Sequence, residues 1–149
     1  MQRLIAAAVL AAAPAAPAAA DEYMTLEAQG TVAEAADRLV AAIEDAGARV
    51  VARIDHQANA ASVDLELPPA TKVIFGNPGL GTPVMQQDIR AAFHLPQMIL
   101  IYEDAGGRTQ VMWQAPTQTF EGLDVDAGSE AATRMGGALE TLAGAAAGE

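Results

Sequence analysis

The chain has 149 residues, a formal net charge of −11 at pH 7 and no cysteine. A surface this acidic repels a phosphate backbone, so the composition argues against nucleic-acid binding, and it disfavours anionic membrane surfaces for the same reason. Without cysteine the protein has neither disulfides nor thiolate chemistry, and its stability has to come from packing.

Residues 1–20 have the three parts of a secretory signal peptide. Arg3 gives the segment a positive start, an uncharged apolar run covers 4–13, and small residues end the segment at a cleavage site. The apolar run is too short to span a bilayer, which takes about 20 residues, so we expect no stable membrane insertion. We expect a periplasmic or secreted protein of one domain, 21–149, whose net charge becomes −12 because Arg3 is lost and no acid is.

The first half of this domain is predicted to alternate strands with helices. Residues 23–28 alternate polar and apolar side chains, which predicts a strand. Thr31 and Glu34 have the spacing of a capping box and open an amphipathic helix that Gly47 ends. The β-branched residues of 50–55 then predict a second strand.

A short alanine-rich helix is expected after the second strand. Asp55 stands where an N-cap would accept hydrogen bonds from a helix over 56–65, and Pro68 and Pro69 end that segment. The apolar residues of 72–76 predict a third strand.

The segment 76–81 is rich in glycine and is predicted to be a loop. Thr82 follows as an N-cap, with Pro83 at the first helical position, and together they predict a helix to about Ala92. The chain therefore presents a glycine loop at the start of a helix.

The clearest local prediction is a β-hairpin. Residues 97–103 are apolar on both faces, as in a central strand, and the turn 104–107 leads into a second strand over 109–115. Ser129 is then expected to cap a final helix over 129–143, after which the last residues should fray.

These elements predict an α+β fold with two layers: a mostly antiparallel sheet of about five strands with helices packed on it. An open sheet also has edges, and an exported protein has to cover such an edge or pair it with a second copy. We therefore expect a homodimer.

The segment 75–85 resembles the bacterial family known as domain of unknown function 302. Further segments agree in order and spacing, namely 54–56, 67–69, 95–96 and 103–107. The resemblance covers 31–116 and implies a small α+β domain, exported or cytosolic, with no established activity. Trp113 departs from the family, in which we would expect a tyrosine.

The glycine loop is the main candidate site. Helix N-termini carry unpaired N–H groups and the positive end of a dipole, and glycine lets a ligand approach the backbone. The predicted ligand-binding residues are Asn77, Gly79, Gly81, Thr82, Asp55 and His56. The alternative is a strand-to-helix turn that needs glycine only for its backbone angles.

Catalytic and metal sites find little support in the residue pattern. Asp55 and His56 are neighbours at a strand end, but adjacent strand residues point to opposite faces, and Asp55 also suits a capping role. No nucleophile elbow occurs, and the histidines and methionines are not grouped as metal ligands would be. We therefore assign no catalytic residue, metal or cofactor.

The leading hypothesis is a non-catalytic module that binds a small anionic ligand or another exported protein. The first alternative is a small hydrolase or isomerase in which His56 or His94 acts as general base. The second is a structural dimer that assists another exported protein.

Overall fold

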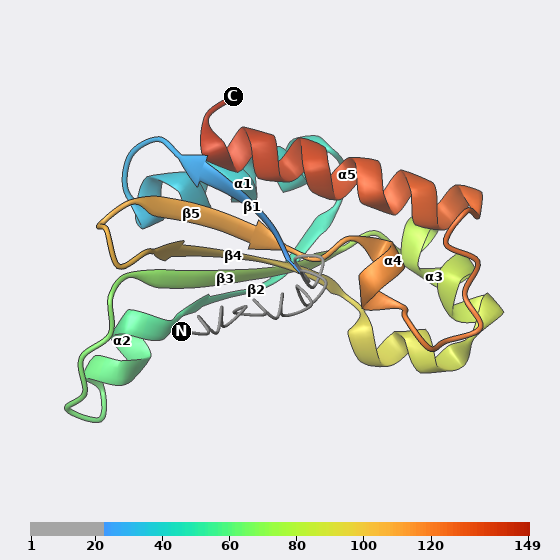
Figure 1. The fold of residues 1–149 in the computed structure, drawn as a ribbon, viewed down its shortest axis with the longest axis horizontal. Helices are drawn as coiled ribbons and strands as arrows, with labels where there is room; N and C mark the ends of the chain where they lie inside the picture. The colour runs from blue at the N-terminus through green and yellow to red at the C-terminus, as the bar shows by residue number, and fades with distance from the viewer. Residues whose placement is uncertain (1–22) are drawn as a thin grey trace, which may run out of the picture.

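The computed structural model describes residues 23–149 (Figure 1). The predicted signal peptide, residues 1–20, lies outside the described residues. In the part of the chain from residue 23 onward, no helix combines the length and the apolar character needed to cross a membrane.

Within residues 23–149, five strands form one antiparallel sheet. The strands are β1 (Met24–Ala28), β2 (Arg49–Asp55), β3 (Ala70–Gly76), β4 (Gln97–Glu103) and β5 (Thr109–Trp113). Their order across the sheet is β1-β5-β4-β3-β2. The predicted α+β class and the mostly antiparallel sheet are confirmed.

The longest helices cover one face of this sheet. The helices are α1 (Val32–Asp45), α2 (His56–Ala61), α3 (Pro78–Gln87), the 3₁₀ helix η1 (Ile89–His94), α4 (Pro116–Thr119) and α5 (Glu130–Ala147). Helices α1 and α5 contact each other and lie side by side over the sheet, whereas α2 and α3 lie at its opposite ends (Figure 1). The domain therefore has two layers.

The core lies between the sheet and these two helices. Strand β3 alternates partly exposed and buried side chains, and Val73 and Phe75 point inward. Leu39, Ile99 and Leu139 are at most 1% exposed in the same apolar cluster. Burying each such side chain contributes about 1.5–3 kcal/mol, so this layer contact is the main stabilising feature of the fold.

Helix α1 begins and ends as its sequence predicts. The Thr31 hydroxyl oxygen accepts a hydrogen bond from the Glu34 amide at 3.3 Å, and Glu34 Oε2 accepts one from the Thr31 amide at 2.8 Å. This reciprocal pair satisfies two amides that a helix start leaves free. Gly47 follows the helix with φ of +69°, a backbone angle that glycine adopts without strain.

The hairpin between β4 and β5 is also confirmed. Asp104 Oδ1 accepts hydrogen bonds from the Gly106 amide at 2.8 Å and the Arg108 amide at 3.0 Å. The bond from the Arg108 amide is the main reason that the pKa of Asp104 lies below its ordinary value. Gly107 completes the turn with φ of +75°.

The predicted start of the third helix is wrong by five residues. Helix α3 begins at Pro78, and Asn77 is its N-cap, accepting a hydrogen bond from the Gly79 amide at 2.9 Å. Thr82 therefore lies within the helix, as does Pro83. Asn77 and Pro78 form the same pair of N-cap and proline as Thr82 and Pro83, and they come earlier in the chain. The helix starts at this earlier pair, so the glycine segment forms its first turns.

The expected fraying of the last residues is also wrong. Helix α5 continues to Ala147, and Ala143, Ala146 and Ala147 are at most 2% exposed. Its final carbonyls have partners from distant parts of the chain: Arg38 Nη2 donates to the Ala146 carbonyl at 2.7 Å and the Gln29 amide to the Ala147 carbonyl at 2.9 Å. Tertiary contacts thus order a segment whose small side chains predicted disorder.

The sheet has its edges at β1 and β2. Strand β2 contains a register shift between Val50 and Ala52, and Arg49 and Arg53 lie on the same strand. Bulges and charges of this kind blunt an edge against pairing with another chain. The homodimer stays a prediction.

Candidate functional site

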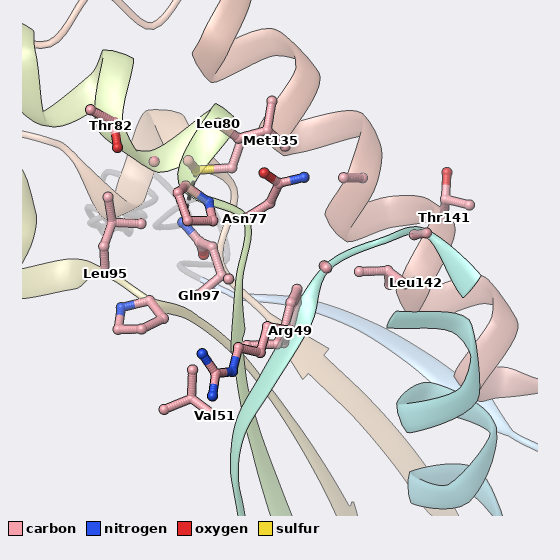
Figure 2. A pocket seen from close by; sticks show the side chains of 18 of the residues that line it. Arg49, Val51, Asn77, Leu80, Thr82, Leu95, Gln97, Met135, Thr141 and Leu142 are labelled. Carbon is pink, nitrogen blue, oxygen red and sulfur yellow. Dashed lines mark hydrogen bonds between the residues drawn. The ribbon is translucent and has the colours of Figure 1, made fainter. Parts of the chain in front are cut away.

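A cavity of about 630 Å³ lies between α3, α5 and the adjacent ends of β2, β3 and β4 (Figure 2). Its lining is mostly apolar or small: Ala42, Ala46, Ala48, Val51, Phe75, Gly76, Pro78, Leu80, Gly81, Met85, Ala92, Leu95, Pro96, Met135, Gly137, Ala138, Leu142 and Ala145. The polar side chains in the lining belong to Arg49, Asn77, Thr82, Gln97 and Thr141.

Helix α5 forms a wall of this cavity with both large and very small residues. Met135 and Leu142 are each 4% exposed and contribute to the apolar surface. Between them, a Cβ placed on Gly137 would meet no atom within 4 Å. The space in front of Gly137 is therefore open, and a larger side chain there would extend into it.

Two side chains at the end of α3 hold that helix to the loop before α5. Gln87 Oε1 accepts a hydrogen bond from the Asp126 amide at 2.8 Å, and Asp88 Oδ2 accepts one from the Asp124 amide at 3.0 Å. Gln87 also donates to Ser129 Oγ at 3.3 Å, at the N-cap of α5. The two helices that border the cavity are thus connected beyond their apolar contact.

Asp88 is a buried carboxylate whose charge has several partners. Its oxygens accept hydrogen bonds from the Arg90 amide at 2.9 Å and from Arg90 Nη2 at 2.6 Å, in addition to the Asp124 amide. These bonds, led by the one from the Arg90 side chain, hold the pKa of Asp88 far below its ordinary value. Asp88 was not recognised in the sequence, because it was placed inside a predicted helix.

Three of the predicted loop residues line the cavity, but their amides are not available to a ligand. Asn77, Gly81 and Thr82 line it, whereas Gly79 does not. The Gly79 amide bonds to Asn77 Oδ1, and the amides of Leu80 and Gly81 bond to the Asn77 carbonyl at 2.9 and 3.0 Å. The expectation of free amides for an anion is therefore wrong, because the segment is helical.

Asp55 and His56 lie at the other end of the sheet. Asp55 pairs with Thr71 at the start of β3, whereas Gly76, at its end, pairs with Arg49. The structure therefore does not bring these two residues to the glycine segment. Asp55 Oδ1 accepts a hydrogen bond from the Ala58 amide at 2.9 Å, so its predicted capping role is confirmed.

A second hollow, of about 770 Å³, lies beside Asp55 at the α2 end. It is nominally larger than the first, but all eight of its lining residues are exposed, whereas the lining of the first includes the buried side chains of Phe75, Met135 and Leu142. A ligand gains little from an open hollow, because little of its surface leaves water. The cavity beside α3 is therefore the better candidate site.

Neither histidine lies in these hollows. His94 is exposed at the end of η1 and meets the rings of Phe93 and Phe120 edge-on. His56 is partly exposed in the first turn of α2, and neither residue lines the cavity. Among residues 23–149, no three His, Asp or Glu side chains gather as a metal site would require.

The cavity itself was not predicted from the sequence. Arg49, Met85, Gln97 and Met135 line it from four different elements. Gln97 Nε2 donates to Met135 Sδ at 2.9 Å, a contact across 38 positions of the chain. No local spacing in the sequence relates these lining residues to one another. The glycine segment was the only sequence feature that pointed to this part of the molecule.

Comparisons with known proteins identify the domain and its fold. Residues 24–142 match the family model described as "Domain of unknown function DUF302". A crystal structure of an uncharacterised conserved DUF302 protein from Bacillus stearothermophilus superposes with a TM-score of 0.76 at 18% identity, covering 85% of this chain and 99% of the other. The match extends beyond the 31–116 expected from the resemblance.

Curated relatives from Brucella match a shorter stretch. The fluoride-specific ion channels FluC 1 of Brucella suis and FluC 1 of Brucella abortus are each 39% identical over 85 residues, or 57% of this chain. The match occupies 34% and 32% of those two proteins, so this chain spans about a third of their length.

Proposed function

This chain belongs to the DUF302 family, and we propose that it is a non-catalytic domain that binds a small, largely apolar molecule in the cavity between α3 and α5. The observation that carries the proposal is the cavity itself. Its volume of about 630 Å³ lies within the range of about 300–1,000 Å³ that is usual for small-molecule sites.

The walls of the cavity favour binding by burial of apolar surface. Leu80 and Met85 come from α3, and Met135 and Leu142 from α5, and all four are buried or partly buried (Figure 2). A ligand that covers them gains about 25 cal/mol for each Å² of apolar surface removed from water. The bonds that hold α3 to the loop before α5 reduce the cost of ordering the site on binding.

The general-base alternative has no comparable support. It requires a histidine at a binding pocket, and neither His56 nor His94 lines the cavity. The described residues that do line it include no nucleophile and base in contact, and their hydroxyl groups belong to Thr82 and Thr141. A binding role needs none of these groups.

Replacing Gly137 by leucine tests the proposal. The new side chain would occupy the open space in front of α5, so we expect Gly137→Leu to weaken binding of an uncharged apolar dye, N-phenylnaphthylamine, by at least about tenfold. Dye fluorescence measures the affinity. Leucine also favours a helix over glycine by up to about 1 kcal/mol, so thermal unfolding should show a fully folded variant.

Thr133→Leu is the matched control. Thr133 is exposed on α5 one turn before Gly137, does not line the cavity, and gains a similar apolar side chain. We expect its dye affinity to equal that of the unaltered protein. Equal affinities for all three proteins would place the dye outside the cavity and contradict the proposed site.

A second candidate is a role beside another protein, as the predicted interaction module or assisting dimer. In the Brucella relatives the matching segment is part of a chain about three times as long as the match, so a related domain occurs joined to further sequence. Native mass spectrometry of the protein from its own cell envelope separates the candidates. A small adduct supports ligand binding, a second protein supports this role, and loss of residues 1–20 supports export.

A further inference from the structure

We propose that the ligand is an apolar carboxylate whose charged group pairs with Arg49 while its hydrocarbon part fills the cavity. This assignment rests on the proposed function and names the class of ligand. It follows from three observations: the charge in the lining, the lack of a partner for Arg49, and the position of Arg49 in the sheet.

Among residues 23–149, Arg49 is the one ionisable residue that lines the cavity. The protein as a whole carries a formal net charge of −11, yet no Asp or Glu of residues 23–149 lines this cavity. Figure 2 shows Arg49 among the labelled lining side chains, with Val51 and Gln97 nearby in the view. The site therefore combines an apolar interior with a single positive charge, which complements an amphipathic anion.

The Arg49 side chain has no partner among residues 23–149. The other five arginines of this region do: Arg38 donates to backbone carbonyls, and ion pairs are formed by Arg53, Arg90, Arg108 and Arg134. Within the described part of the chain, Arg49 makes neither an ion pair nor a side-chain hydrogen bond. Its guanidinium thus keeps all its donors for a ligand, and its planar shape suits the two oxygens of a carboxylate.

The sheet places Arg49 beside the start of α3. Arg49 pairs with Gly76, and the next residues, Asn77 and Pro78, begin that helix and also line the cavity. The positive charge of Arg49 therefore lies at the end of the cavity where α3 begins.

Calorimetric titration of the intact protein tests the ligand class. The probes are octanoate, decanoate and dodecanoate, below their micellar concentrations, and the primary alcohols of the same lengths. We expect affinity to rise by about fourfold for each added methylene group until the cavity is full. We expect each carboxylate to bind about fivefold more tightly than its alcohol at low ionic strength, and this preference to shrink in salt.

Arg49→Gln identifies the source of the preference. The variant should bind carboxylate and alcohol equally, and thermal unfolding should show that it is folded. Arg134→Gln is the matched control, because it removes the same charge from an exposed residue of α5 outside the cavity. We expect this control to keep the full preference for the carboxylate.

The outcomes separate this inference from the proposed function. If carboxylates and alcohols bind equally in the unaltered protein and Gly137→Leu weakens both, the cavity binds apolar molecules but the carboxylate assignment is overturned. A preference that survives in Arg49→Gln also overturns it. If no probe binds, both the ligand class and the proposed function are overturned.

Discussion

The two ends of β3 lead to two very different hollows. Where the strand begins, Thr71 pairs with Asp55, and the adjoining hollow is lined only by exposed residues of α2 and the segment after it. Where the strand ends, Gly76 leads into α3, and the lining of the cavity there includes buried side chains of α5 and the sheet, namely Met135, Leu142 and Phe75. The two ends are separated along the full length of the strand (Figure 1).

This difference shows why the polar residues at Asp55 and the glycine segment at Gly76 do not come together in one site. Asp55 and the glycine segment belong to neighbouring strands, which favoured a shared site. In an antiparallel pair, however, the end of one strand lies beside the start of the next. What distinguishes the cavity is a third element, α5, which lines it but contributes no residue to the hollow beside α2.

The largest effect should separate a leucine of the packed core from a leucine beside the exposed hollow. Leu139 is 1% exposed on α5, whereas Leu65 is 65% exposed after α2. We expect Leu139→Ala to lower the free energy of unfolding by about 2–5 kcal/mol, because it leaves a void in the core. Leu65→Ala should change it by less than about 0.5 kcal/mol. Urea denaturation measures both, and similar losses would contradict the difference in packing.

The next effect concerns the carboxylate that holds α3 in place. We expect Asp88→Asn to lower the urea midpoint at neutral pH, because the charge accepts hydrogen bonds from Arg90 and Asp124. The pKa of Asp88 is lowered by folding, so its contribution is present above the ordinary value of 3.8 and is lost as the pH falls below it. The difference in urea midpoint between Asp88→Asn and the unaltered protein should therefore become smaller as the pH is lowered.

Asp126→Asn is the control for this pH dependence. Asp126 lies in the same loop and is exposed, and its carboxylate accepts a hydrogen bond from the nearby Gly128 amide. We expect only a small shift in the urea midpoint for this variant. The difference in urea midpoint between Asp88→Asn and the unaltered protein could instead stay constant from neutral pH to about pH 2. That result would show that the charge of Asp88 does not stabilise the fold.

The smallest effect on stability is expected for substitutions at two helix caps. They also test which of the two hollows binds a ligand. Asp55 caps α2 and Asn77 caps α3, so replacing either by alanine should cost about 0.5–2 kcal/mol. Of these two residues only Asn77 lines the cavity, and we expect only Asn77→Ala to weaken binding of the apolar dye. A loss of dye binding in Asp55→Ala would place the ligand at the α2 end instead.

Much of the fold could be predicted from the sequence because its signals are local. The capping box at Thr31, the cap at Asp55 and the turn at Asp104 each satisfy backbone groups within a few residues, and the structure confirms all three. The alternation of side chains in the hairpin likewise depends only on neighbouring residues. Such signals were sufficient for the α+β class and for most of the elements.

The errors arose where distant contacts decide between local alternatives. Two cap-and-proline signals lie five residues apart, and the earlier one, at Asn77, starts α3. The last turns of α5 are rich in small residues, and they are ordered because Gln29 and Arg38 bond to their carbonyls. Neither choice can be made from a window of a few residues.

The family resemblance and the order of the elements were present in the residues themselves, whereas the cavity came into being only with the tertiary structure. Its positive charge and its apolar walls lie on strands and helices far apart in the chain, so no spacing relates Arg49 to Met135. A cavity is the space that packed elements leave between them, and it therefore depends on how those elements meet rather than on which residues follow one another.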